Sequence, residues 1–388
     1  METIGLMMNL IRQEVCDYNL VASDFSLLTE EKLNELYSIS KAHDLAHIVG
    51  TALDKKGLIK PEYSVTAKFK KQMMLAVFRV ERLNYDLVDL SEILEKAGVD
   101  FIPLKGSVLR GYYPSAYQRT SCDIDVLVRE EDLKSSVKIL EENGYKKEEF
   151  GSHDVSFFSP SGNHIELHYD LVEDGRANSS KKILSDVWNV AQVKEGKKHY
   201  YELPDEMFYF YHVAHAVKHF ENGGCGIKPL IDCWVLNHRV EFDSQKRQEL
   251  LKKGGLDKFE RVFQELSEGW FSGKEMSATA LKMQNYIVKG GVYGNTENKV
   301  RVKRAKSKGK FRYFLSRIFI SYDALKYSYP VLIKHKWLMP FMQIARWFRL
   351  VFKRDSAKRS INELKINGAV SEKQAEETAE FFSEIGLL

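Results

Sequence analysis

The sequence predicts an α+β protein in which a small, mixed but mostly antiparallel sheet lies between two helical regions. The chain of 388 residues is 44% hydrophobic and 29% charged, which is enough apolar material for a packed core. Apolar residues recur at helical spacing before and after a middle stretch of short apolar runs separated by turn residues. We therefore expect four parts: an N-terminal helical region at 1–98, an α+β core at 99–203, a helical domain closing a cleft at 204–290, and a basic linker with a C-terminal helical region at 291–388.

In the first part, the clearest helix is expected from Glu62 to Ala97. Pro61 precedes this segment and Gly98 follows it, which are the usual positions of proline and glycine at helix ends. The apolar residues step by three and four positions and form one stripe: Phe69, Met73, Val77, Val80, Leu83, Leu87, Leu90 and Leu94. The stripe predicts a face that packs against the earlier helices.

In the second part, the hydrophobic period changes from that of a helix to that of strands. The pattern predicts strands at 99–102, 123–128, 145–150, 155–159 and 164–168. It also predicts helices at 108–112 and 130–142. The tetrapeptide Pro160-Ser161-Gly162-Asn163 is typical of a hairpin turn. Because most of these strands follow one another closely in sequence, they are expected to pair mostly antiparallel.

In the remaining parts, the helical period returns. Helices are expected near 205–220, 229–239, 244–253 and 257–270. A glycine-rich and then cation-rich linker is expected at 290–310. Between Lys299 and Arg317 there are nine Lys or Arg residues and no acidic residue. The stretch 299–354 is compatible with a weak contact to RNA or to an anionic membrane surface, or with a plain solvated linker and helix face.

The composition excludes several classes of protein. The four cysteines are scattered without a CxxC pair, which argues against a disulfide framework and a structural zinc site. The first residues form an amphipathic pattern without the basic start of a signal peptide. No apolar run approaches the roughly 20 residues that span a bilayer. We expect a reduced, cytoplasmic protein, and the net charge of +4 is too small to indicate a nucleic-acid binder by itself.

Two carboxylates carry the main functional signal. Asp123 and Asp125 lie two residues apart on a predicted strand, so both side chains project from the same face. Their repulsion is relieved most simply by a hard divalent cation, Mg²⁺ or Mn²⁺, which takes oxygen ligands and leaves positions open for phosphates. The alternative is a solvated strand edge.

The surroundings of this pair favour phosphoryl chemistry. Upstream, the predicted strand ends in Lys105-Gly106-Ser107, where a glycine before a helix lets backbone N–H groups approach a phosphate. A third carboxylate, Glu166, shares a face of the last predicted strand with His164 and His168. Two metal-binding carboxylates and a third that activates a hydroxyl are what phosphoryl or nucleotidyl transfer requires. The two histidines leave open a transition-metal site.

Further candidate residues lie in the predicted helices after residue 203. On the 205–220 helix, the histidines at 212, 215 and 219 fall opposite an apolar face, and either a solvated face or a wall of the catalytic cleft is consistent with this. Asp232 lies in an apolar run, where a carboxylate needs a partner. Either a structural hydrogen bond or a role in the cleft explains it.

The string LKGSVLRGYYPSAYQRTSCDIDVLV at 104–128 closely resembles the signature of the uncharacterised bacterial nucleotidyltransferase family of the polymerase-β-like superfamily. Weaker resemblances are KAHDLAHIVGTAL at 41–53, HIELHYDL at 164–171, HAVKHF at 215–220 and YPVLIKHKWLMP at 329–340. In this sequence Glu166 stands where the family more often has an aspartate. The change is conservative for metal binding.

The resemblance implies a polymerase-β-like fold and a set of site residues. Asp123, Asp125 and Glu166 would be the catalytic and metal-binding carboxylates, with two Mg²⁺ ions and a nucleoside triphosphate (NTP) such as ATP. The substrate contacts that it implies or favours are Lys105, Gly106, Ser107 and Arg119 toward the triphosphate, and His215, Lys218, His219 and Asp232 in the cleft.

The expected activity is the transfer of a nucleoside monophosphate (NMP) from an NTP to an acceptor hydroxyl, with release of pyrophosphate. The acceptor is left open among a small molecule, a saccharide, a protein and RNA. One alternative is a nucleotide-binding or scaffold protein that has lost catalysis. Another is an antitoxin-like nucleotidyltransferase that modifies a protein or RNA.

Overall fold

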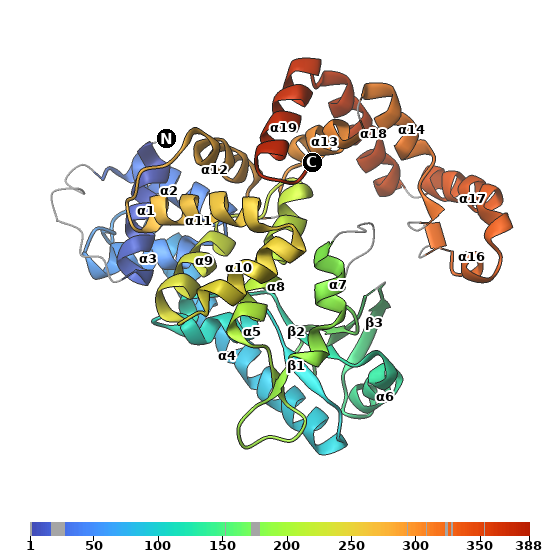
Figure 1. Cartoon of the computed structure of the whole chain (residues 1–388). Helices are drawn as coiled ribbons and strands as arrows, with labels where there is room; N and C mark the ends of the chain where they lie inside the picture. Colours follow the sequence, from blue (N-terminus) through green and yellow to red (C-terminus); the bar gives the residue numbers. More distant parts are fainter. Residues whose placement is uncertain are drawn as a thin grey trace.

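A computed structural model describes residues 2–16, 28–151, 153–171, 179–292, 294–307, 309–322, 325–326, 329–352 and 354–388 (Figure 1). The architecture is α+β, as the sequence predicts, with a five-stranded sheet that lies, along the chain, between helices that precede it and helices that follow it (Figure 1). The first helices are α1 (Glu2–Val15), α2 (Glu30–Ala42), α3 (Ala46–Lys55) and α4 (Ser64–Ala97).

The middle of the chain holds the sheet and its short helices. In order these are β1 (Phe101–Pro103), α5 (Gly106–Leu109), η2 (Arg110–Tyr112), η3 (Ala116–Gln118), β2 (Asp123–Val128), η4 (Glu130–Asp132), α6 (Leu133–Glu142), β3 (Lys146–Phe150), β4 (Asp154–Phe158), β5 (His164–His168), α7 (Ser179–Ser185), η5 (Val187–Asn189), β6 (Gln192–Val193) and β7 (Tyr201–Glu202). The strands expected before residue 170 are all present. The small β6–β7 sheet was not predicted, because its strands are only two residues long.

Helices return after β7. They are α8 (Asp205–Glu221), α9 (Lys228–Arg239), α10 (Ser244–Gly254), α11 (Asp257–Phe271), α12 (Ala278–Gly290), α13 (Thr296–Ser307), α14 (Lys310–Ile318), α16 (Val331–Lys334), η6 (Lys336–Leu338), α17 (Met339–Phe352), α18 (Arg354–Ala369) and α19 (Glu372–Glu384). None of the described helices combines the length and the apolar character needed to cross a bilayer.

The five strands of the main sheet are ordered β1-β2-β5-β4-β3. Three of the neighbouring pairs are antiparallel, which confirms the mostly antiparallel prediction, and β2 with β5 is parallel. In that parallel pair Asp125 lies directly opposite Glu166. Two carboxylates that are far apart in the sequence therefore meet in adjacent strands.

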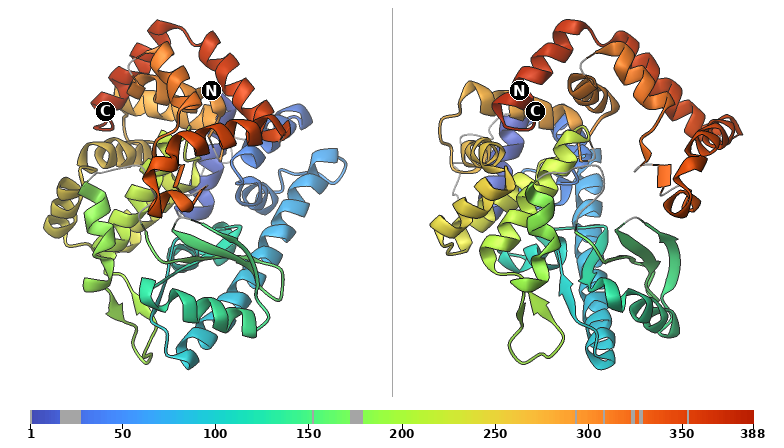
Figure 2. Two further views of the ribbon diagram at one scale, coloured as in Figure 1. Left: turned by 90° about the vertical axis from the view of Figure 1, so that its right-hand side faces the viewer. Right: turned by 45° about the vertical axis from the view of Figure 1, so that its right-hand side comes forward.

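The long helix α4 links two separate hydrophobic cores. Phe69, near its start, packs in the core formed by the helices of both chain ends, and Leu83 packs in the core between α4 and the sheet. Figure 2 shows α4 running from the N-terminal helices down past the sheet. The predicted single stripe is wrong at Val77, which is 41% exposed, because the buried face changes where the helix leaves one core for the other.

The prediction of a linker at 290–310 is wrong. Most of this stretch is helix α13, which packs against α18 and α19. Val300 and Val302 are fully buried or nearly so, and Arg304 is 3% exposed and bonds to the Val370 carbonyl oxygen. The helix was not predicted because the Lys and Arg residues alternate with the valines, so the sequence shows no continuous apolar face. The proposed division of the chain into four parts stays a prediction.

Candidate active site

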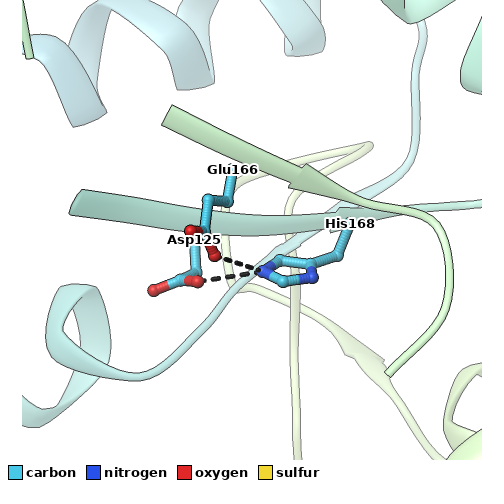
Figure 3. Close-up of side chains that lie close together, drawn as sticks. All are labelled: Asp125, Glu166 and His168. Atoms are coloured by element: carbon cyan, nitrogen blue, oxygen red, sulfur yellow. Dashed lines mark hydrogen bonds and ion pairs between the residues drawn. The ribbon is translucent and has the colours of Figure 1, made fainter. Parts of the chain in front are cut away.

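The site is built where β2 and β5 run parallel. Ile124 and Val126 point into the core behind the sheet, which turns Asp125 to the opposite face. On that face His168 Nε2 lies 2.9 Å from Asp125 Oδ1 and 3.4 Å from Glu166 Oε2 (Figure 3). The strand register thus gathers two carboxylates and an imidazole at one point of the sheet.

This group has the donor atoms of a metal site. One atom each from Asp125, Glu166 and His168 lie within 4.8 Å of one another, the only such group among the described residues. Two carboxylate oxygens suit Mg²⁺ or Mn²⁺, whereas the imidazole nitrogen suits a transition metal. Asp123, which the sequence assigned to the metal, lies outside this group but lines the same cavity.

Lys105 balances the charge of the buried carboxylates. It has a backbone φ of +46°, a conformation uncommon for a residue with a side chain. Its Nζ lies 2.6 Å from Asp125 Oδ1 and 3.9 Å from Glu166 Oε2. Burial opposes the charge, but the Asp125 carboxylate prevails and raises the pKa of Lys105. Lys105 is not a free surface cation, since its side chain is 20% exposed and ion-paired.

The two aspartates of β2 differ in their affinity for protons. Burial and the neighbouring Asp125 carboxylate raise the pKa of Asp123 to about 6. Burial also opposes the charge of Asp125, but Lys105 and His168 outweigh it and lower the pKa of Asp125. A divalent cation would relieve the repulsion that Asp123 feels, so the donor set fits such an ion.

Asp232 and Arg119 form a buried ion pair on the far wall of the site. Asp232 is fully buried, and its Oδ1 accepts from Arg119 Nε at 2.7 Å and from the Tyr113 hydroxyl at 2.7 Å. Its Oδ2 is buried without a hydrogen-bond partner among the described residues. The structural hydrogen bond that was one explanation of Asp232 is thus present. Asp232 also lines the cavity, as the other explanation requires.

The histidines of α8 are not on a solvated face. His212 is 8% exposed and its Nε2 lies 3.0 Å from the Pro229 carbonyl oxygen. The Nε2 atoms of His215 and His219 are 3.0 Å apart. Burial lowers the pKa of His215 far below its usual value and that of His219 to about 4. Both rings are therefore neutral at pH 7, and one donates to the other.

Between them lies Lys218, whose ammonium group faces the same site. Burial and the charge of Lys105 lower the pKa of Lys218 to about 8, although Glu166 favours the charged form. A lysine with such a pKa is mostly charged at pH 7, but it loses its proton more readily than an ordinary lysine.

A cavity of about 440 Å³ unites these groups between the sheet, α8 and α9. Every site residue that the family resemblance implies lines it except Ser107: Lys105, Gly106, Arg119, Asp123, Asp125, Glu166, His215, Lys218, His219 and Asp232. The Ser107 N–H donates to the Leu104 carbonyl oxygen at 3.1 Å, and its Oγ is buried without a partner among the described residues. Ser107 is thus close to the cavity in sequence but not part of its lining.

Sequence analysis missed several residues of the cavity. Asp44, with φ of +54°, pairs with Lys228, whose Nζ also donates to Thr120 Oγ1 at 3.1 Å. Tyr211 is buried in the wall, where burial raises its pKa against the opposing charge of Lys105, and His153 also lines the cavity. A signal that could have indicated Asp44 is its place in the string KAHDLAH, where it interrupts a helical pattern.

Comparison with known protein families gives one match, in which residues 29–272 correspond to a family described as uncharacterised nucleotidyltransferase. The chain belongs to this family. Searches of curated proteins and of solved structures found no match. The matched part of the chain runs from α2 to α11 and contains the whole sheet and nearly all of the cavity lining. Helices α12 to α19 lie beyond it.

Proposed function

We propose that this nucleotidyltransferase transfers an NMP from an NTP to an acceptor hydroxyl and releases pyrophosphate. The observation that supports it most is the parallel register of β2 and β5, which puts Asp125 beside Glu166 at a cavity that also contains Asp123. The volume of about 440 Å³ is within the range of roughly 300–1,000 Å³ typical of small-molecule sites. The acceptor stays open among a small molecule, a saccharide, a protein and RNA.

Asp123, Asp125 and Glu166 would hold Mg²⁺ or Mn²⁺, with His168 completing the set of donors. When bound, a divalent cation neutralises charge on the triphosphate and on the transition state. Lys218, Arg119 and Lys105 contribute further positive charge around the triphosphate. Gly106 also lines the cavity, and there is little room for a larger residue at this position, because a Cβ there would lie 3.0 Å from the Ser121 side chain.

In the reaction, the acceptor oxygen forms a bond to the α-phosphorus of the NTP. The bond from that phosphorus to the bridging oxygen breaks, and pyrophosphate leaves with the electron pair. Glu166 accepts the proton of the acceptor hydroxyl, since it is the most exposed carboxylate of the metal group, with 27% of its side chain exposed. His215 and His219, both neutral, bound the cleft on the side of α8.

The test uses each radiolabelled NTP with a cell extract as the source of acceptor. Asp125→Asn and Asp123→Asn should each reduce Mg²⁺-dependent labelling by about 100-fold or more. The matched control is Glu92→Gln, an acidic residue of α4 that is 58% exposed and remote from the cavity. Circular dichroism would establish that the variants fold. Full labelling by both aspartate variants, or labelling that survives removal of divalent cations by EDTA, contradicts the proposal.

One observation favours the alternative function of a nucleotide-binding protein that has lost catalysis. Lys105 and Arg119 are each already ion-paired, with Asp125 and Asp232, so part of the positive charge of the cavity is neutralised before any nucleotide binds. A protein that only binds nucleotide would be stabilised against heat by ATP with Mg²⁺ and release no pyrophosphate. The antitoxin-like alternative predicts a labelled protein or RNA in the extract, and gel analysis of the labelled product separates it from a small-molecule acceptor.

A further inference from the structure

The far end of the C-terminal arm, defined as α14, α16, η6 and α17, carries an apolar stripe that faces solvent. Four of its side chains are largely exposed: Trp337 at 69%, Phe341 at 58%, Ile344 at 45% and Phe348 at 63%. They are spaced by four, three and four residues, which places them on one face of the η6–α17 segment. An exposed stripe of this kind indicates a surface that meets a partner.

The opposite face of α17 holds the polar contacts, which inverts the usual arrangement of a surface helix. Gln343 is 5% exposed, and its Nε2 donates to the Ile320 carbonyl oxygen at 2.6 Å. Arg346 Nη1 and Trp347 Nε1 donate to the Ile318 carbonyl oxygen at 3.1 Å and 2.9 Å. A helix that only faces water turns its apolar side inward. Here hydrogen bonds to the end of α14 fix the helix with its apolar side outward.

The stripe is surrounded by positive charge. Residues 329–354 contain six Lys or Arg residues and no Asp or Glu. Lys334, Lys336 and Arg349 are exposed, and the last two are direct neighbours in sequence of Trp337 and Phe348. Figure 1 and the right view of Figure 2 show α16 and α17 at the end of an arm that stands away from the other helices.

We propose that α17, with η6 and α16, lies on the surface of an anionic lipid bilayer. A bilayer of this kind takes the aromatic and aliphatic side chains into its acyl boundary and pairs the cations with its headgroups. The helix α17 has 14 residues, fewer than the roughly 20 that span a bilayer, so it lies along the surface.

The two other classes of partner fit the same face less well. A nucleic acid would place its phosphates against cations at the centre of the contact, where this arm has bare apolar side chains. A second copy of the chain would oppose two positively charged faces, which repel. The proposal does not depend on the proposed activity, since the stripe lies outside the cavity.

The experiment is flotation of the full chain with vesicles of phosphatidylcholine alone or mixed with phosphatidylglycerol. We expect flotation with the mixed vesicles, weakened by salt. The variant Phe341→Ser, Ile344→Ser, Phe348→Ser should lose binding by about tenfold or more. The matched control is Met74→Ser, Phe78→Ser, Val88→Ser on α4, whose side chains are equally exposed, at 72%, 59% and 59%. It should float like the parent chain.

A second variant separates charge from apolar contact. Lys334→Gln, Lys336→Gln, Arg349→Gln should bind mixed vesicles about tenfold more weakly and lose most of the salt dependence. Thermal melting would check that each variant folds, and Phe348→Ser alone replaces the triple variant if the latter melts early. The proposal is overturned if the parent chain floats with neither vesicle, or if the α4 control loses binding as much as the α17 variant. It is equally overturned if the stripe variant instead abolishes RNA binding or self-association while flotation is unchanged.

Discussion

At the scale of single residues, Lys105 is the side chain on which the electrostatics of the site depend. It stands just after the end of β1 with a positive φ, and it contacts Asp125, a carboxylate of the site that is almost fully buried. A buried carboxylate without a counter-charge costs folding free energy, so the ion pair with Lys105 stabilises the folded site when no cation is bound. The same contact keeps Lys105 close to where a triphosphate would lie.

Replacing this lysine should therefore destabilise the fold. We expect Lys105→Met to lower the free energy of unfolding by about 3 kcal/mol, because it leaves the Asp125 charge buried with only His168 beside it. Urea denaturation measures this change. The control is Lys96→Met, whose ion pair with Glu92 is largely exposed and should contribute nothing measurable. Equal stability of the two variants would show that the Lys105–Asp125 contact is not energetically significant.

At the scale of elements, α4 and the strand that follows it are positioned by a single glycine. Gly98 ends the 34-residue helix in the left-handed conformation with φ of +73°, and its N–H bonds to the carbonyl oxygens of the last turn. This sharp end lets the chain turn directly into β1, and Lys105 follows two residues after β1 ends. The cap thus links the longest helix to the site.

Gly98→Ala should lower the free energy of unfolding by about 1–2 kcal/mol, through backbone strain. Steric contact contributes little, since an added Cβ would meet only His199 Nε2 at 3.8 Å. Gly5→Ala is the matched control, because Gly5 lies in α1, has open space around it and has no positive φ, so alanine should stabilise the helix. Thermal unfolding compares the two, and a Gly98→Ala protein as stable as the parent chain would refute the cap argument.

At the scale of the whole molecule, the cavity is closed by contacts between distant parts of the chain. The Asp44–Lys228 ion pair joins the region before α3 to the start of α9, and Lys228 also holds the Thr120 carbonyl oxygen at 3.1 Å. The helices of both chain ends share one hydrophobic core. The ion pair therefore joins two regions that the core already holds together.

A double-mutant cycle of Asp44→Asn and Lys228→Met should give a coupling free energy of about 1–2 kcal/mol, measured by denaturant unfolding. The reference cycle uses Lys138 and Glu142, an exposed pair within α6, for which no measurable coupling is expected. Coupling as small in the first cycle as in the second would mean that the ion pair does not fasten the two regions.

The sequence by itself determined the α+β class, most helices and strands, and the candidate carboxylates, because periodicity and the spacing of acidic residues are local properties. Asp123, Asp125 and Glu166 all reach one cavity as expected, although their catalytic role stays a prediction. Local pattern failed at 290–310, where charge masked a helix whose burial depends on α18 and α19.

Only the tertiary structure decided which groups meet. The parallel pairing of β2 with β5 joins strands about forty residues apart, and no local signal sets that register. The same holds for the pairing of Lys105 with Asp125, of Arg119 with Asp232 and for the outward stripe of α17. Each depends on which surface a segment packs against. That choice is set by the packing and electrostatic energy of the whole chain, and the local periodicity of the sequence carries no information about it.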